Sequence, residues 1–330
     1  VGEWDGTPGL DIVVAANHGA IQLDPSGARI KETRFQFHGK ASGSIEDDDQ
    51  SSMLGNVQVV DMEGDGKCEY LARGSLDGAA LFSSEGKVIW STDERKKDQG
   101  FVQNVTVGDL DNDLSAEIVV SWDGIQIFDK TGKKLSQVDE EYGDSKIEIV
   151  DTDGDGKNEI ISVAANLKIR NAKGEMIKEI PVEGYFSNYF LLQTPGSIQP
   201  SLLVMYGGQL LFLNLNGDVV SRFAAPLSEF DDTVQIGFDG DEIRGTNVYE
   251  AEGVWIKLVN EQPKFLAVIT NFAGIDRSVL DVFTPEGKLL YQEILPDTCS
   301  SIAALPETDG KRVESLLVAC EATPWKFALR

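Results

Sequence analysis

The chain has 330 residues, of which 55 are acidic and 29 are basic, so its formal net charge is −26 at neutral pH. A chain of this length can bury a large core, and a surface this acidic repels nucleic acid and anionic lipid. The sequence contains only two histidines, which leaves almost no material for a histidine metal cluster or a Ser-His-Asp triad. No segment of the sequence is long and apolar enough to span a membrane as a helix.

The predicted elements follow one repeated pattern along the chain. An apolar strand, a turn that ends in glycine and a second apolar strand recur six times. The turn glycines are Gly27, Gly86, Gly132, Gly174, Gly217 and Gly287. Glycine at one fixed place in each turn suits a residue with positive φ, so we expect a β-hairpin around each of them. A period of about 40–50 residues with several strands per unit is typical of propeller blades.

A second repeat, an acidic loop between two strand-like runs, occurs three times. Each loop has carboxylates at positions 1, 3, 5 and 9, and we expect position 7 to offer its backbone carbonyl. The predicted ligand residues are Asp61, Glu63, Asp65, Lys67 and Glu69 in loop 1, Asp109, Asp111, Asp113, Ser115 and Glu117 in loop 2, and Asp151, Asp153, Asp155, Lys157 and Glu159 in loop 3. A degraded copy, with Glu3, Asp5 and Asp11 in phase, is a weaker candidate for a fourth site.

The spacing of these carboxylates predicts a calcium ion in each of the three loops. Four carboxylates this close repel one another unless a cation lies between them, and Ca²⁺ accepts six to eight oxygen ligands in flexible geometry. The loops resemble an EF-hand over their first half only, since Ala72, Val120 and Ser162 stand where an EF-hand has its bidentate Glu. β-branched runs on both sides place each loop between strands. A turn rich in Asp and Gly that binds no metal is the alternative.

The two repeats combine into a blade of four antiparallel strands. Strand a precedes the acidic loop, strand b follows it, and strands c and d form the glycine hairpin. We therefore predict an all-β chain that forms a single β-propeller domain of seven four-stranded blades over residues 1–330. The approximate blades are 1–40, 53–98, 99–143, 144–183, 184–226, 227–296 and 297–330. The first blade lacks strand a, and the last lacks strand d.

Two cysteines are placed where a cross-link can form. Cys299 and Cys320 flank the a–b hairpin of the last blade, where antiparallel pairing can bring them close enough for a disulfide, and two free thiols are the alternative. Cys68 lies in loop 1, and we expect its side chain to point away from the metal, because a thiolate is a poor calcium ligand. The five tryptophans lie in or beside predicted strands, where burial between blades is expected, and Trp122 is the best candidate among them for an exposed ring that stacks on a sugar.

The three loops and their strand flanks resemble the calcium-binding repeats of the FG-GAP/VCBS class, found in integrin α-subunit propellers and many secreted bacterial proteins. The likeness rests on the start of loop 2, Gly108-Asp109-Leu110-Asp111, and on Asp151–Glu159 with the two isoleucines that follow it. This resemblance implies a scaffold for extracellular recognition in which ions stiffen the loops of one rim. It does not imply a reaction.

Three functions remain open. The first is a calcium-stabilised recognition or adhesion propeller, secreted, periplasmic or on the cell surface, that binds a protein or a carbohydrate without catalysis. The second is a carbohydrate-active enzyme of the polysaccharide-lyase type, which needs a cleft with a metal and a nearby Lys, His, Arg or Tyr. The third is a structural domain of a larger exported protein. We favour the first, because neighbours on a strand such as Glu140 and Glu141 point to opposite faces and make a poor acid–base pair. We expect a monomer that binds about three Ca²⁺ ions and neither nucleic acid nor the membrane interior.

Overall fold

The computed structural model describes residues 12–16, 19–24, 28–37, 40–41, 54–62, 67–74, 78–92, 102–140, 143–144, 146–163, 166–182, 189–192, 200–206, 209–224, 248–257, 264–272, 277–284, 288–305, 315–320 and 325–328. The regular structure of these residues is β-strand throughout. No helix among them has the length and apolar character needed to cross a bilayer. Contacts divide the chain into two units, residues 1–179 and 180–330.

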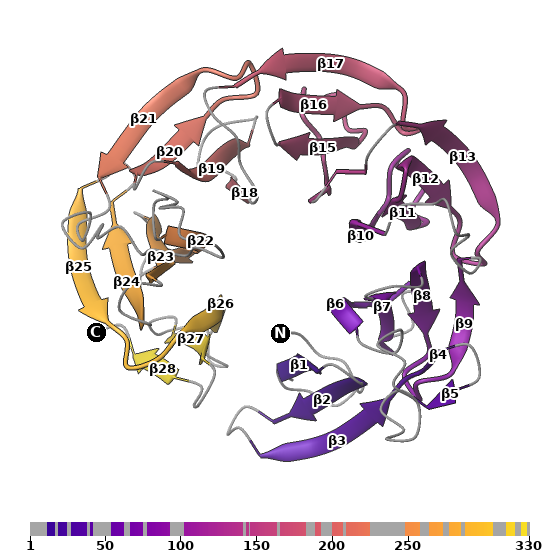
Figure 1. Cartoon of the computed structure of the whole chain (residues 1–330), viewed down its shortest axis with the longest axis horizontal. Coiled ribbons are helices and arrows are strands. Elements are labelled where there is room, and N and C mark those ends of the chain that lie inside the picture. Colours follow the sequence, from indigo (N-terminus) through magenta and orange to yellow (C-terminus); the bar gives the residue numbers. More distant parts are fainter. Residues whose placement is uncertain are drawn as a thin grey trace, which may run out of the picture. The chain divides into compact units, whose positions relative to one another are not determined.

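The strands occur in the order of the predicted repeats (Figure 1). The first unit contains β1 (Ile12–Ala16), β2 (Gly19–Leu23), β3 (Arg29–Arg34), β4 (Gln36–Phe37), β5 (Lys40–Ala41), β6 (Leu54–Val60), β7 (Glu69–Gly74), β8 (Gly78–Phe82), β9 (Val88–Ser91), β10 (Asn104–Gly108), β11 (Glu117–Ser121), β12 (Gly124–Phe128), β13 (Lys134–Asp139), β14 (Glu148–Val150), β15 (Glu159–Val163), β16 (Asn166–Arg170) and most of β17 (Met176–Pro181). The second unit contains β18 (Tyr189–Leu192), β19 (Ser201–Tyr206), β20 (Gln209–Leu213), β21 (Val219–Ala224), β22 (Val248–Lys257), β23 (Lys264–Phe272), β24 (Arg277–Phe283), β25 (Leu289–Ile294), β26 (Cys299–Leu305), β27 (Ser315–Cys320) and β28 (Trp325–Ala328).

Each sheet is an antiparallel meander in which strands that are consecutive in the chain pair with one another. Five sheets have four strands, namely β6–β9, β10–β13, β14–β17, β18–β21 and β22–β25. The sheets β1–β3 and β26–β28 have three strands each. The described part of the chain thus contains seven sheets of three or four strands, besides the small sheet of β4 and β5. The small sheet of β4 and β5 was not predicted.

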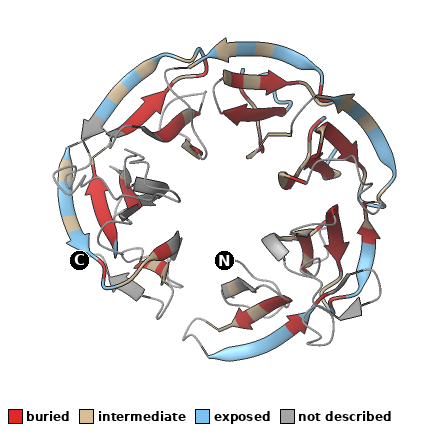
Figure 2. Ribbon diagram, viewed as in Figure 1, coloured by how far each residue is buried: buried red, intermediate tan, exposed pale blue. Residues whose placement is uncertain are grey.

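Burial depends on the position of a strand within its sheet (Figure 2). Strands b and c of the third blade, β11 and β12, are buried at every residue. Strand d of the same blade, β13, has no buried residue, since each of its residues is either exposed or half-buried. Strands covered on both faces need nearly continuous apolar runs, which explains sequences such as Gly-Ile-Gln-Ile-Phe in β12.

Apolar layers join neighbouring sheets within each unit. In the first unit, Leu71 of β7 shares a core cluster with Val120 of β11. On the other face of β11, Val119 shares a second cluster with Ile160 of β15. In the second unit, buried residues of β20 and β23 form a common cluster, as do residues of β24 and β27. The two faces of a central strand therefore pack against two different sheets.

The c–d hairpins share one hydrogen-bonding pattern. A side-chain oxygen three residues before the turn glycine accepts the backbone N–H of the residue after the glycine, which closes the turn locally. The accepting residues are Asp24, Ser83, Asp129, Asn171, Asn214 and Thr284. The described turn glycines have φ between 80° and 82°, as predicted, while Gly27 and Gly287 lie outside the described residues.

Antiparallel order fixes which connections share an end of a sheet. In the sheet β10–β13, the acidic a–b loop and the c–d hairpin lie at one end. The b–c turn and the connection from β13 to β14 lie at the opposite end. In each sheet that contains an acidic loop, this loop therefore lies at the same end as the c–d hairpin.

Candidate metal centre

Loop 2 connects β10 to β11 and is organised around the carboxylate of Asp109. Its Oδ1 accepts the backbone N–H of Asn112 at 2.7 Å and that of Asp113 at 3.2 Å. Its Oδ2 accepts the N–H of Leu114 at 2.8 Å. The loop curls around its first residue because this carboxylate satisfies backbone donors that lack a partner in the strands.

Loop 3 connects β14 to β15 and repeats this geometry around Asp151. Asp151 Oδ1 accepts the N–H of Gly154 at 2.6 Å and that of Asp153 at 3.2 Å, while Oδ2 accepts the N–H of Gly156 at 3.0 Å. These hydrogen bonds, that of Gly154 first, lower the pKa of Asp151, so the carboxylate stays charged. Position 1 of loop 3 is therefore an anion before any metal is considered.

Positions 4 and 6 have positive φ in both loops. The φ values are 83° at Gly154 and 84° at Gly156, against 63° at Asn112 and 69° at Leu114. Glycine adopts this conformation without steric cost and asparagine tolerates it, whereas leucine does not. Leu114 is also 93% exposed, so burial of its side chain does not offset the strain.

Position 9 is a buried glutamate that contacts the start of its own loop. Glu117 Oε2 accepts the N–H of Leu110 at 2.9 Å. Glu159 Oε2 accepts the N–H of Thr152 at 2.9 Å and its hydroxyl at 2.7 Å. Each glutamate is 8% exposed and is the first residue of strand b. The buried strand thus presents a carboxylate to the interior of the loop.

The carboxylates at positions 1, 3 and 9 converge in both loops. Ligand oxygens lie within 4.8 Å of one another in each of two groups, Asp109 with Asp111 and Glu117, and Asp151 with Asp153 and Glu159. Three hard oxygen donors at this spacing suit a hard divalent cation. Within the described part of the chain, no hydrogen bond reaches either carboxylate oxygen of Asp111. The two acidic groups can therefore hold metal ions.

The electrostatics of loop 2 also favour a cation. Burial raises the pKa of Glu117, and the charges of Asp111, Asp113 and Asp109 raise it further, while the hydrogen bond from Leu110 opposes the shift. The raised pKa means that the folded loop disfavours the charged form of this glutamate. A bound cation would oppose both the desolvation and the repulsion.

The two groups of converging carboxylates do not include Asp113 and Asp155, which occupy position 5. Asp113 Oδ1 accepts the N–H of Ser115 at 2.8 Å, and Asp155 Oδ1 accepts the N–H of Lys157 at 2.7 Å. The carboxylates at position 5 therefore support the turn. The roles predicted for these four residues as metal ligands stay predictions.

Loop 1 is described only at its two ends. Glu69 Oε2 accepts the N–H of Met62 at 3.0 Å, which matches the contact of Glu117 and of Glu159. Glu63 and Asp65 lie outside the described residues, as do Glu3, Asp5 and Asp11 of the candidate fourth site. The predicted sites at these positions stay predictions.

Two predictions about single side chains have opposite outcomes. Cys68 is buried in a core cluster, and its Sγ donates to the Tyr70 hydroxyl at 3.7 Å. Its side chain thus packs in the core, as expected. Trp122, predicted to be an exposed ring, is 4% exposed and belongs to the core between the second and third blades. This prediction was wrong because a large apolar ring beside a turn gains more from burial than from exposure.

A partly buried ion-pair cluster, which was not predicted from the sequence, links the connection after β13 to β16. Arg170 of β16 has a fully buried side chain that contacts Glu140 Oε1 and Asp144 Oδ2, each at 2.8 Å. Lys168 of the same strand contacts Glu140 at 3.1 Å and Asp144 at 3.2 Å. The cluster joins the connection after β13 to the following sheet. The sequence offers one sign of this cluster, which is that Lys168 and Arg170 lie on the same face of a strand whose other residues are buried or half-buried.

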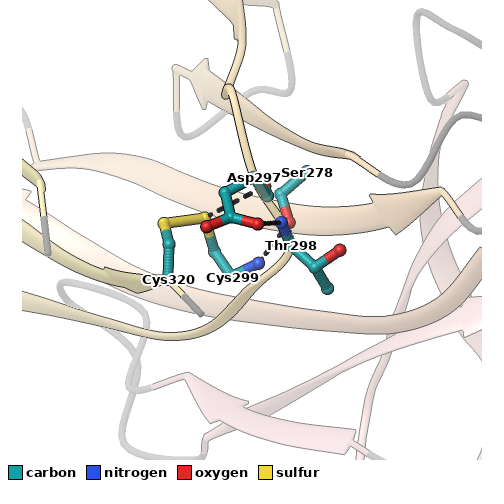
Figure 3. The surroundings of a disulfide bond; sticks show 5 residues. All are labelled: Ser278, Asp297, Thr298, Cys299 and Cys320. Carbon is teal, nitrogen blue, oxygen red and sulfur yellow. Dashed lines mark hydrogen bonds between the residues drawn. A yellow bond between two sulfur atoms is a disulfide. The ribbon is translucent and has the colours of Figure 1, made fainter. Parts of the chain in front are cut away.

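Cys299 and Cys320 form a disulfide between β26 and β27 (Figure 3), which decides between the two alternatives that the sequence left open. The two residues are partners in the antiparallel register of these strands. The N–H of Cys299 donates to Ser278 Oγ at 2.7 Å, which ties the disulfide to β24 of the preceding sheet. Cys68 is the free cysteine.

Comparisons with known proteins identify the fold and no family. No family model matches the chain, and no curated protein matches it in sequence. Similar solved structures include two crystals of BBS1N in complex with ARL6DN, one soaked with mercury and one with lead. The mercury-soaked structure is 10% identical, covers 97% of this chain and 87% of that chain, and has a TM-score of 0.61. The lead-soaked structure is 10% identical, covers 98% of this chain and 90% of that chain, and has a TM-score of 0.64.

A third similar structure is the biofilm matrix protein Bap1 of V. cholerae. It is 12% identical, covers 98% of this chain and 64% of that chain, and has a TM-score of 0.47. The likeness to the BBS1N propeller, together with the four-stranded antiparallel meanders, shows that the chain is a β-propeller.

Proposed function

We propose that this β-propeller is a calcium-stabilised recognition or adhesion module outside the cytoplasm, related to the FG-GAP/VCBS class, that binds a protein or a carbohydrate without catalysis. One observation carries the proposal: the carboxylates at positions 1, 3 and 9 converge in two successive loops, Asp109–Glu117 and Asp151–Glu159. A site that forms twice from the same spacing is a property of the repeat and not of one local turn.

Calcium suits these loops better than other divalent cations. The loops offer carboxylate and carbonyl oxygens, which disfavours the softer metals that select thiolate or imidazole. Mg²⁺ demands nearly ideal octahedral geometry and keeps several of its waters, whereas Ca²⁺ accepts irregular sets of six to eight oxygens. An acidic turn between two strands provides such an irregular set.

The disulfide supports a location in an oxidising compartment. Disulfides persist in secreted, periplasmic and cell-surface proteins and are rare where thioredoxin and glutathione keep thiols reduced. Cys299 and Cys320 are bonded in this chain. Extracellular fluid also contains calcium at concentrations that match the weaker sites of extracellular modules, with dissociation constants of about 10⁻⁴–10⁻³ M.

Recognition is proposed over catalysis for two reasons. BBS1N is in complex with ARL6DN, so a chain of similar fold binds a protein partner. A lyase needs a free basic or phenolic group beside its metal, but Lys168 and Arg170 are paired with Glu140 and Asp144. These two carboxylates follow β13, at the end of the sheet opposite to loop 2.

Thermal unfolding tests the metal part of the proposal. We expect EDTA to lower the melting temperature and excess calcium to restore it, because an ion that binds only the folded state stabilises it by about 2.7 kcal/mol at 100 times its Kd. Asp111→Asn and Asp153→Asn should each remove part of this response. Glu85→Gln, at an exposed acidic residue in a hairpin outside the loops, should leave it intact. Identical melting curves for metal-free and calcium-loaded protein would overturn the assignment.

Binding and turnover are tested on the same protein sample. We expect saturable binding on a glycan array, or to a protein partner recovered from the native surface, that EDTA weakens. No product should accumulate when acidic polysaccharides are incubated with the calcium-loaded protein. Calcium-dependent release of unsaturated oligosaccharides would assign the chain to the polysaccharide lyases instead.

A further inference from the structure

Asn158 of loop 3 donates two hydrogen bonds to loop 2. Its side-chain Nδ2 donates to the backbone carbonyl of Asp109 at 2.6 Å, and its backbone N–H donates to the carbonyl of Leu110 at 3.3 Å. Gly156 of loop 3 is also close to loop 2, since a Cβ on this glycine would lie 3.9 Å from the side-chain nitrogen of Asn112. The two acidic loops are thus neighbours joined by two hydrogen bonds.

Both ends of this contact belong to the candidate metal sites. Asn158 is position 8 of loop 3, between Lys157, whose carbonyl is a predicted ligand, and the converging carboxylate of Glu159. Asp109 is position 1 of loop 2, and the N–H of Leu110 binds the converging carboxylate of Glu117. Any change that fixes residues 157–159 therefore also fixes the two residues that start loop 2.

We propose that Asn158 couples the metal sites of loops 2 and 3, so that a cation in one loop raises the affinity of the other. This inference rests on the proposed function, since it requires both loops to bind cations. Ordering a loop around an ion costs conformational entropy, and a second ion that binds a segment already ordered meets a smaller cost. Linkage makes the effect reciprocal, and coupling factors between sites in proteins are typically about 5–150-fold.

At the other junction between acidic loops, the residue that corresponds to Asn158 has an apolar side chain. Position 8 of loop 2 is Ala116, which packs against the apolar cluster that contains Met62 of loop 1. Position 8 of loop 1 is Cys68, whose side chain lies in the core of the first two blades. An amide at position 8 is therefore specific to the junction of loops 2 and 3, and we expect the coupling there to exceed that between loops 1 and 2.

Repulsion between the two bound cations acts in the opposite direction. It weakens with salt, because the screening length is about 8 Å at physiological ionic strength. The contribution of the Asn158 side chain depends on its hydrogen bond to the backbone carbonyl of Asp109, which salt screens little. The coupling that is lost on removing Asn158 should therefore be nearly independent of salt, which separates it from ion–ion repulsion.

Calcium titration calorimetry on a cycle of variants measures the coupling. All proteins carry Asp61→Asn, which silences loop 1, and the affinity of loop 2 is compared with loop 3 intact or disabled by Asp153→Asn. With Asn158 present, disabling loop 3 should weaken calcium binding at loop 2 at least fivefold. With Asn158→Ala, the same change should leave the affinity of loop 2 within a factor of two. Asn166→Ala is the matched control, because the amide of Asn166 donates to Glu179 on the same sheet, away from the loops.

The outcomes separate this inference from the proposed function. No calcium heat in any variant overturns the proposed function, and the coupling with it. Two calcium sites that titrate independently, or a coupling that survives in Asn158→Ala, overturn the coupling alone. If Asn158→Ala fails to fold by circular dichroism, Asn158→Leu replaces it, since leucine is neutral, has a similar size and offers no donor to the Asp109 carbonyl. Retained coupling in Asn158→Leu contradicts the proposal, and lost coupling supports it.

Discussion

Gly132 lies against the indole ring of Trp90. A Cβ on this glycine would be 1.5 Å from Trp90 Cδ1, so no other residue fits without displacement of the ring. Gly132 is the turn glycine of the third blade, and Trp90 is on strand d of the second blade. Gly132 therefore has two roles. Its positive φ forms the hairpin turn, and its lack of a side chain leaves room for Trp90 of the preceding blade.

This contact makes Gly132→Ala strongly destabilising. We expect a loss of about 2–4 kcal/mol in the free energy of unfolding, because alanine is strained at positive φ and also overpacks the site. Gly174→Ala is the control, since its φ is 81° against 82° at Gly132, yet its nearest atom, a methyl of Ile125, is 3.1 Å away. Urea unfolding should show about 1 kcal/mol less damage at Gly174. Equal losses would mean that backbone strain alone explains why glycine recurs at this position of the repeat.

Repeated local signals made the fold predictable from sequence. The turn glycines and the acidic loops report nearby backbone geometry, and their period reports the blades. The pairing of Arg170 with Glu140 was not predictable, because these residues are 30 positions apart, Glu140 after the end of β13 and Arg170 on β16 of the next sheet, and meet only when the chain packs. Trp122 was misjudged for the same reason. In the acidic loops, spacing predicted the convergence of positions 1, 3 and 9 but not the local hydrogen bonds of Asp113 and Asp155.

The strain at Leu114 predicts a stabilising substitution. Leu114→Gly should raise the free energy of unfolding by about 0.5–1 kcal/mol, since relief of the left-handed conformation exceeds the extra entropy of glycine in the unfolded chain. Denaturant unfolding in EDTA measures this effect apart from metal binding. Leu114→Ala removes the exposed side chain but keeps the Cβ, so it should give no such gain. A gain in Leu114→Ala equal to that in Leu114→Gly would assign the effect to the exposed apolar surface instead.

The ion-pair cluster around Arg170 predicts strong coupling between its members. Burial of Glu140 raises the pKa of its carboxyl. The hydrogen bonds and the charge of Arg170, and to a smaller extent those of Lys168, outweigh this effect, so the pKa is lowered. Its stabilising effect is therefore complete above the unfolded pKa and is lost as the pH falls through the lower folded pKa. Arg170→Met leaves two carboxylates with less compensation, and we expect it to cost about 3–5 kcal/mol at pH 7.

A double-mutant cycle separates this pairing from simple packing. Glu140→Gln combined with Arg170→Met should cost less than the sum of the two single changes, because neither charge is then left without its partner. Arg222→Met, at an exposed arginine of β21, should change the stability by less than about 0.5 kcal/mol. Additive losses at Glu140 and Arg170 would show that the two side chains contribute independently.

The disulfide predicts a response to reductant. It closes a segment with a sequence separation of 21, so its removal should cost about 3 kcal/mol by restoring entropy to the unfolded chain. We expect dithiothreitol to lower the melting temperature of the wild type and to leave that of Cys299→Ser/Cys320→Ser unchanged. Cys68 is free in both proteins and serves as an internal control. If the wild type melts at the same temperature with and without dithiothreitol, the disulfide does not stabilise the protein.

Asp281 predicts an unusual dependence of stability on pH. This carboxylate on β24 is 2% exposed, and its Oδ1 accepts a hydrogen bond from Gln292 at 2.8 Å. Burial raises its pKa to about 6 from 3.8, although the hydrogen bond from Gln292 opposes the shift. Because the folded pKa lies above the unfolded one, the group lowers stability as the pH rises from about 4 to 6, and the full loss is present above that range.

Asp281→Asn should therefore stabilise the protein at neutral pH. A neutral amide of the same shape avoids the buried charge, and the difference between the two pKa values corresponds to at most about 3 kcal/mol. Urea unfolding at pH 7.5 should show this gain, and unfolding at pH 4 should show little difference between variant and wild type, because Asp281 is then largely protonated in the folded state. Asp218→Asn, at an exposed residue of a hairpin in the same unit, should change neither value. A gain of the same size at both pH values would show that the amide acts through packing or hydrogen bonding and that the charge of Asp281 has no part in it.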